Sequence, residues 1–285
     1  MNRFSYLLPL LAILISGGEI FRLLSGGQTE AMDQRLASQL QSAQGQDPNS
    51  SYLALAQHLP GWSPELCCPY SGEVVPSPGR TGSAVRFTLF RSDPDVTTSR
   101  RAELRLKPVP PNSSYTYRFS VFLPDSYVSD RSFEIVSQWQ NVPDTELQEQ
   151  WRSPPLALLT QGGGWKLHRR WDPNPVTLNN QPGQGGGTET IDLGRYQPNS
   201  WTNWTINVRW SHQSDGWLEV WQNDRRIYHH RGPNRYNDVQ GPYLKIGLYK
   251  PDWKYHPQRS QLNERVIYFD AISVKPSSEN PISKF

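Results

Sequence analysis

The sequence predicts an all-β fold, an antiparallel sandwich, and three observations support this prediction. Of the 285 residues, 25 are Pro and 21 are Gly, and both types favour turns over the interiors of helices and strands. From about residue 70 onward, short segments of alternating apolar and polar residues are separated by turn-forming clusters. The chain also has 11 Trp, 13 Tyr and 9 Phe, whose large rings can fill the core between two sheets.

Ten segments have the alternation or the β-branched and aromatic content of strands, and no long segment has the period of a helix. In chain order, they are residues 84–90, 101–106, 115–123, 133–140, 156–160, 165–171, 204–210, 217–222, 243–248 and 265–274. The clusters rich in Gly, Pro, Asn and Ser at 108–112, 179–187, 211–216 and 250–261 are expected to be turns or loops. Because sandwiches of about 200–250 residues often form one domain, we expect a single domain over residues 52–285.

The first 27 residues have the layout of a secretory signal. Arg3 precedes the apolar run 6–15, which meets the small residues 16–18, and ten residues are too few for a bilayer span of about 20. Residues 20–24 are apolar again, so an uncleaved anchor is the alternative. The polar stretch 28–51 reads as a linker. We therefore expect a secreted, periplasmic or extracellular protein without a stable membrane domain.

The charge balance limits the possible partners. The 29 Lys and Arg against 26 Asp and Glu give a net charge of +3, too small for generic nucleic-acid binding. We expect no nucleic-acid partner, and any polyanion must be bound locally.

The two cysteines, Cys67 and Cys68, are adjacent, and because neighbours rarely meet the geometry of an ordinary disulfide, we expect two thiols.

Alternation assigns polar side chains of several strands to one outer surface. Side chains at i and i+2 point the same way, so Ala102 and Leu104 face the core while Arg101, Glu103 and Arg105 face outward. The same rule predicts outward side chains on three further strands. On 133–140 they are Glu134, Gln138 and Gln140, and Phe133, Ile135 and Trp139 point the other way. On 243–249 they are Tyr243, Lys245 and Tyr249, with a notch at Gly247, and on 165–171 they are Lys166, His168 and Arg170. Guanidinium and amide groups pair with carboxylates, so this surface suits an anionic saccharide, although each strand alone would also fit a solvated outer face.

Three of these segments resemble the signature strands of the jelly-roll polysaccharide lyases. The segments are R-A-E-L-R at 101–105, Q-W-Q at 138–140 and Y-L-K-I-G-L-Y at 243–249. They are similar to R-[ST]-E-L, Q-[IV]-H and Y-F-K-A-G-x-Y of the alginate lyases and of the related heparin-lyase and glucuronan-lyase groups, in the same order over about residues 70–275. The resemblance implies a concanavalin-like β-jelly-roll with a concave cleft. It also implies β-elimination on a uronate polymer, a reaction that requires no cofactor.

The resemblance also implies roles for individual residues. Arg101 and Gln138 would neutralise the uronate carboxylate, and Tyr249 would donate a proton to the leaving oxygen. Lys245, four residues before Tyr249, is the cation expected to lower its pKa. The residues expected to bind substrate are Gln140, Glu103, Arg105, Tyr243, Lys166, His168 and Arg170.

One departure concerns the base that removes the C5 proton. The families carry His where this chain has Gln140, and an amide cannot act as a base at neutral pH. The base would then be Tyr249 itself or an imidazole from His168, His229, His230 or His256.

Two further expectations concern metal binding and the rival functions. The resemblance points to Asp270 as a ligand of a structural Ca²⁺, with an Arg partner as the alternative. A glycoside hydrolase would need paired carboxylates in a run such as E-x-D-x-x-E, which the chain lacks. A non-catalytic, lectin-like protein that binds anionic polysaccharides is the main alternative to a lyase. We expect a monomer that acts on an anionic polysaccharide.

Overall fold

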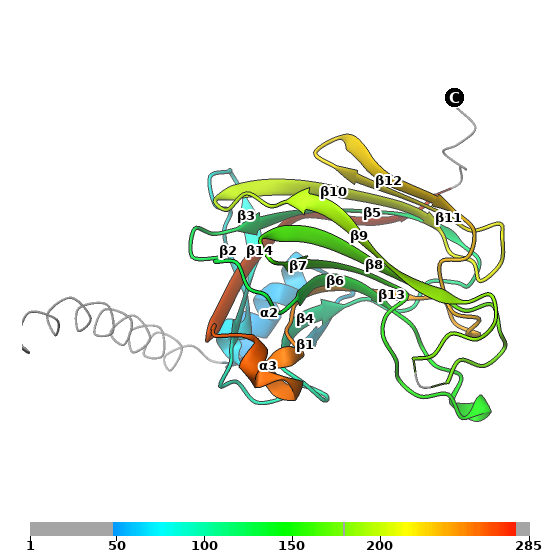
Figure 1. Cartoon of the computed structure of the whole chain (residues 1–285). Coiled ribbons are helices and arrows are strands. Elements are labelled where there is room, and N and C mark those ends of the chain that lie inside the picture. Colours follow the sequence, from blue (N-terminus) through cyan, green and yellow to red (C-terminus); the bar gives the residue numbers. More distant parts are fainter. Residues whose placement is uncertain (1–47, 179, 278–285) are drawn as a thin grey trace, which may run out of the picture. The chain divides into compact units, whose positions relative to one another are not determined.

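Two antiparallel sheets pack face to face in the computed structural model, which describes residues 48–178 and 180–277 (Figure 1). The first sheet has the order β1 (Ser63–Glu65), β4 (Arg101–Arg105), β13 (Tyr243–Tyr249), β6 (Glu134–Gln140), β7 (Leu156–Gln161), β8 (Gly164–Trp171) and β9 (Gly187–Arg195). The second has the order β12 (Arg225–Arg231), β11 (Trp217–Gln222), β10 (Ser200–Arg209), β5 (Ser114–Leu123), β14 (Glu264–Pro276), β3 (Ser83–Phe90) and β2 (Gly72–Pro76). The predicted all-β jelly-roll sandwich is confirmed.

Short helices complete the described part of the chain. They are α2 (Pro48–His58), α3 (Asp252–Tyr255) and the 3₁₀ turns η1 (Pro69–Ser71), η2 (Thr145–Leu147) and η3 (Pro257–Arg259). The predicted signal at 1–27 lies outside the described residues, as does the predicted linker up to residue 47. Because α2 starts at Pro48, the last four residues of that predicted linker belong to a helix. No helix in residues 48–178 and 180–277 is long and apolar enough to cross a membrane.

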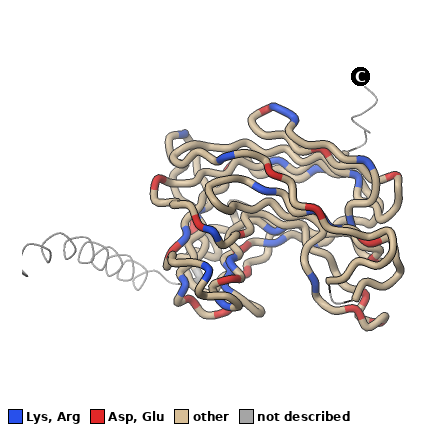
Figure 2. Tube along the Cα trace, viewed as in Figure 1, with Lys and Arg blue, Asp and Glu red and all other residues tan. Residues whose placement is uncertain are grey.

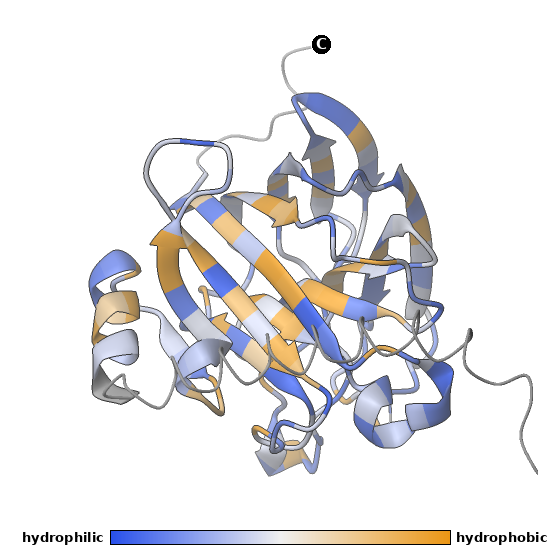
Figure 3. Cartoon of the chain, turned by 90° about the vertical axis from the view of Figure 1, so that its left-hand side faces the viewer, coloured by the Kyte–Doolittle hydropathy of each residue, from blue (hydrophilic) through white to orange (hydrophobic). Residues whose placement is uncertain are grey.

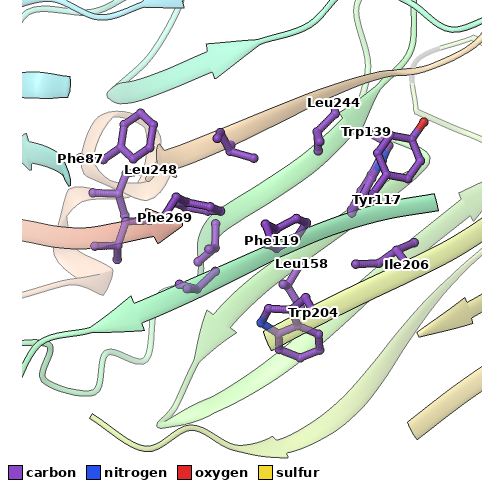
Figure 4. Close-up of a cluster of buried hydrophobic side chains, with 14 of the residues drawn as sticks. Phe87, Tyr117, Phe119, Trp139, Leu158, Trp204, Ile206, Leu244, Leu248 and Phe269 are labelled. Atoms are coloured by element: carbon purple, nitrogen blue, oxygen red, sulfur yellow. The ribbon is translucent and has the colours of Figure 1, made fainter. Parts of the chain in front are cut away.

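The core between the sheets combines large aromatic rings with aliphatic side chains (Figure 4). Trp139 of the first sheet is fully buried and meets Tyr117 of the second edge to face, with 5.3 Å between ring centroids. Trp165 and Trp204 form a similar pair at 5.2 Å. Each large ring buries roughly 150–250 Å² of surface, so a few such pairs hold the two sheets together. Hydrophobic and hydrophilic residues alternate as bands along several strands (Figure 3).

A β-bulge in β6 changes which residues face the core. The pairing of β6 with β7 shifts between Ile135 and Ser137, so strict alternation fails there. Val136 packs in the core beside Trp139, whereas Ile135 lies on the opposite face in a separate apolar cluster. The prediction that Ile135 and Trp139 share one face is therefore wrong, because one extra residue reverses the faces of all residues before it.

The prediction of two thiols at Cys67 and Cys68 is also wrong. The two sulfurs form a disulfide between adjacent residues, whose Cα atoms are 3.7 Å apart. Cys67 Sγ also lies 3.3 Å from Ser71 Oγ. The disulfide follows β1 by one residue and so lies close in sequence to Glu65, a residue of the groove described below.

Candidate active site

A groove of about 900 Å³ lies on the outer face of the first sheet. Side chains of β4, β13, β6 and β8 form its floor, and two loops form its walls. One wall comes from the β6–β7 loop, residues 151–154, and the other from residues 251–259, which include α3 and η3. Figure 1 shows α3 and the β6–β7 loop on the same side of this sheet, at opposite ends of its strands.

Strand register brings the four predicted catalytic residues together. Lys245 of β13 is paired with Gln138 of β6 on one side and with Arg105 of β4 on the other. Four residues further along β4 and β13, past Gly247, Tyr249 is paired with Arg101. All of these side chains line the groove, so the three signature segments form one continuous surface.

A cluster of five charged residues occupies the β1 end of the groove. Glu65 of β1 accepts a hydrogen bond from Lys245 Nζ at 2.7 Å and from Arg101 Nη1 at 3.2 Å, and its other oxygen lies 3.4 Å from Arg105 Nε. Glu103 lies 3.2 Å from Arg101 Nη1 and 3.9 Å from Lys245 Nζ. Because three cations face two carboxylates, the cluster carries one net positive charge.

Glu103 lies beneath the groove and does not line it. Only 1% of its surface is exposed, and Gln138 Nε2 donates to its Oε1 at 2.6 Å. Burial raises the pKa of Glu103, and the nearby Lys245 and Arg101 oppose this rise. The sequence placed Glu103 among the substrate-binding residues, but the structure gives it another position, since it holds the amide of Gln138 and the guanidinium of Arg101 from below.

Gly247 is required by the backbone and does not form a notch in the groove. Its φ is +131°, and a Cβ atom at this position would lie 2.2 Å from the carbonyl oxygen of Ala102 on the neighbouring strand. Only glycine fits both the φ angle and the close approach. Gly247 lies within the irregular pairing of β13 with β6, between Ile246 and Tyr249.

The cation beside Tyr249 is Arg101 and not Lys245. The Arg101 guanidinium carbon lies 4.4 Å from the centre of the Tyr249 ring, whereas Lys245 Nζ lies 5.8 Å from the ring of Tyr243. Burial raises the pKa of Tyr249 and outweighs the lowering by Arg101. The expectation that Lys245 lowers this pKa is therefore wrong, because Lys245 is directed to Glu65. The Tyr249 hydroxyl carries its proton at neutral pH and can donate it.

The remaining predicted binding residues divide into two groups. Tyr243, Arg105, Gln140, His168 and Arg170 line the groove. Gln140 also braces a wall, because its Nε2 donates to the carbonyl of Arg152 at 3.1 Å. Lys166 lies on the same face of β8 but does not line the groove, and its Nζ donates to Asp192 at 3.2 Å.

Two of the four candidate imidazoles belong to the groove. His168 on β8 and His256 between α3 and η3 line it. His229 and His230 lie on β12 in the second sheet, and His230 Nε2 is 3.0 Å from Arg169 Nη1. The position of β12 at the edge of the second sheet removes both from the groove.

His168 is expected to stay neutral between pH 5 and 8. Burial, together with the nearby Arg170 and Lys166, lowers its pKa to about 4. An unfolded chain would bind this proton near pH 6.5, so the contribution of His168 to stability is present above that pH and is lost as the pH falls towards 4. An NMR titration should give a midpoint near pH 4 for this imidazole; a midpoint above pH 6 would contradict the described environment.

An apolar patch lies between the polar groups of the floor. Ile135, Ala157 and Leu159 form a buried cluster against which Phe133 and Tyr249 pack. Of these, Phe133, Ile135 and Tyr249 line the groove and can contact the apolar face of a sugar ring while polar groups on either side bind its substituents.

Asp270 lies in the second sheet, away from the groove. Its Oδ2 accepts from Ser77 Oγ at 3.0 Å, and its Oδ1 accepts from the Ala271 amide at 2.6 Å. In the described residues, two groups of three potential metal ligands occur: Cys67, Cys68 and Asp93, and Asp144, Glu149 and Asp238. Asp270 belongs to neither group, and a calcium site at Asp270 stays a prediction.

The sequence pattern did not reveal Glu65 or most of the wall residues. Glu65 belongs to a three-residue strand with Pro64 at its centre, and proline argues against a strand except at a sheet edge. Trp151, which is 64% exposed, and Tyr255, which is 51% exposed, lie in segments without a regular period. Only the structure brings these segments to the groove.

The jelly-roll fold and a match to a known family identify the chain as a lyase that acts on polysaccharides. A family model described as "Polysaccharide lyase" matches residues 37–273, and the chain belongs to this family. No curated protein is significantly similar to it in sequence.

Several solved structures share the fold at low sequence identity. The endo-β-1,4-glucuronan lyase of the fungus Trichoderma reesei has a TM-score of 0.60 and 16% identity, covering 72% of this chain and 87% of its own. An alginate lyase from a Chlorella virus has a TM-score of 0.53 and 12% identity, covering 79% and 97%. The PL-14 alginate lyase of Aplysia kurodai has a TM-score of 0.52 and 13% identity, covering 78% and 93%.

Proposed function

We propose that the protein cleaves a uronate-containing anionic polysaccharide by β-elimination. The observation that supports this most directly is the placement of Gln138, Arg101 and Tyr249 in one groove, with the first two held by the buried Glu103. Charges of both signs are interspersed over the domain (Figure 2), so the binding of a polyanion depends on this local arrangement and not on an overall basic face.

The reaction removes the proton at C5, next to the carboxylate, and expels the oxygen at C4. The carboxylate must be neutralised first, because its negative charge makes the C5 proton weakly acidic. Arg101 and the free N–H of Gln138 supply this neutralisation. Tyr249, whose hydroxyl is protonated in the free protein, gives its proton to the departing oxygen. Two groups on the α3 side of the groove can take the C5 proton: the His256 imidazole of the wall, or the phenolate of Tyr249 on β13, which would then pass that same proton to the departing oxygen.

The test is a panel of uronate polymers, monitored for the ultraviolet absorbance of the unsaturated product. Glucuronan and alginate come first because the structurally similar enzymes are named for them. At least one polymer should give the absorbance increase with the parent protein. Binding of several polymers without any increase would instead support the lectin-like alternative, for which the Gln at position 140 is the specific observation.

The predicted export agrees with this function, because large polysaccharides are found outside the cell. It depends on the first 27 residues, and N-terminal sequencing of the protein from its native host tests it.

A further inference from the structure

Arg170 differs from the other cations of the groove. Six Lys or Arg side chains line the groove, and five of them form ion pairs: Arg101, Arg105, Arg152, Lys245 and Arg259. Arg170 forms no ion pair with any residue in 48–178 or 180–277. Its Nη1 makes one long hydrogen bond, 3.4 Å, to the carbonyl oxygen of Pro154.

The surroundings of Arg170 favour an anion from outside the protein. Burial lowers the pKa of Arg170, and among the described residues Tyr236, not a carboxylate, opposes this lowering. The imidazole of His168, two residues away on the same face of β8, is neutral and can donate or accept a hydrogen bond. A half-buried guanidinium that faces a groove without a carboxylate partner is a site for a carboxylate ligand.

The opposite end of the groove disfavours a second carboxylate. There Glu65 is fixed between Lys245 and Arg105, so its own carboxylate already occupies the position that these two cations offer to an anion. A substrate carboxylate placed beside Glu65 would meet a like charge. The two ends of the groove therefore differ, and negative charges of a bound polymer are favoured towards β8.

The register gives the spacing between the two carboxylate positions. Gln138 of β6 is paired with Ala157 of β7, and Ala157 with His168 of β8. Adjacent strands lie about 4.8 Å apart, so β8 is about 10 Å from β6. This is more than one pyranose ring spans, so a carboxylate at Arg170 belongs to a different sugar residue from the carboxylate at Gln138.

We propose that Arg170 is the centre of a second carboxylate subsite, which binds a uronate residue flanking the one held at Gln138. The inference rests on the proposed function and narrows its substrate class to polymers in which uronates recur within the span of the groove. An isolated uronate among neutral sugars would use only the Gln138 site.

The test compares the binding of uronate oligosaccharides of graded length by isothermal titration calorimetry. The oligosaccharides come from the polymer that the parent binds, and all proteins carry Tyr249→Phe so that the ligand stays intact. Arg170→Gln removes the charge, and Arg170→Lys keeps it without the guanidinium fork. Arg118→Gln is the matched control, since it removes one arginine from an exposed position on β5 in the other sheet.

Arg170→Gln is expected to weaken the binding of the longer oligosaccharides about tenfold or more, because a charge-assisted hydrogen bond is lost. The shortest oligosaccharide that binds should be unaffected, Arg170→Lys should recover part of the loss, and Arg118→Gln should match the parent. Equal affinities of Arg170→Gln and Arg118→Gln for oligosaccharides of every length would overturn the proposal. A loss of affinity in Arg170→Gln that is the same for the shortest and the longest oligosaccharides would also overturn it. The proposed function fails separately, if the parent releases no unsaturated product from any polymer.

Discussion

Replacing Tyr249 with phenylalanine is expected to lower the turnover of a uronate polymer by about 10²–10⁴-fold, the usual contribution of a positioned proton donor. The substitution removes only the hydroxyl. The ring remains to pack against Ile135 and Leu159, and the Arg101 guanidinium can still lie over it. Because Arg101, Gln138 and Lys245 are unchanged, the affinity for the polymer should stay within a few-fold of the parent value.

Tyr243→Phe is the matched control for this experiment. Tyr243 lies on the same strand and face as Tyr249, lines the groove and also loses only a hydroxyl. We expect turnover of this variant to fall by less than about tenfold, the effect of a lost neutral hydrogen bond. Near-parent turnover in Tyr249→Phe would show that another group protonates the leaving oxygen.

The pH profile distinguishes the two possible bases. Burial raises the pKa of Tyr249, so the phenolate is a minor form at neutral pH and its fraction grows about tenfold per pH unit. If the phenolate takes the C5 proton, kcat/KM rises with this slope into the alkaline range, and His256→Gln leaves it unchanged. A level profile together with a large loss in His256→Gln would assign the base to His256.

The strands that the sequence predicted and those that it missed differ in their place in the sheets. All ten predicted strands are interior strands, and the four missed strands, β1, β9, β12 and β2, are the four sheet edges. An edge strand has one strand neighbour and is less buried: β12 has no buried residue, and β9 has one, Leu193. Without burial on one face there is little selection for apolar alternation, so the pattern is weak.

The site residues on regular strands were predictable, and those that depend on irregular backbone were not. Arg101 and Lys245 follow simple alternation, and so does Tyr249, because the pairing of β13 with β4 stays regular where its pairing with β6 shifts. Ile135 was assigned to the wrong face, because a bulge has no sequence signal in this segment. Glu65 is distant in sequence from its partners, and its effect on the charge of the groove follows only from the pairing of β1 with β4.

Replacing Glu103 with alanine is expected to affect stability and catalysis together. Arg101 and Lys245 are nearly buried and would keep only Glu65 as a carboxylate partner, and removing one member of a buried ion pair costs about 3–5 kcal/mol of the free energy of unfolding. Gln138 would lose the acceptor that fixes its amide. Since the two groups proposed to neutralise the substrate carboxylate, Arg101 and Gln138, are then misplaced, turnover of the folded protein should fall about 10²-fold or more.

Glu103→Gln separates the catalytic effect from the loss of stability. Its amide oxygen can still accept from Gln138, but it offers no negative charge to Arg101, so turnover should lie between those of the parent and of Glu103→Ala. Glu219→Gln is the matched control, because Glu219 is also a buried strand residue that accepts from an arginine, Arg226, but it lies in the second sheet. Turnover and thermal unfolding are measured for all three variants. Parent-like turnover in Glu103→Gln, with unfolding of Glu103→Ala as the only defect, would mean that Glu103 stabilises the sheet without positioning the groups that act on the substrate.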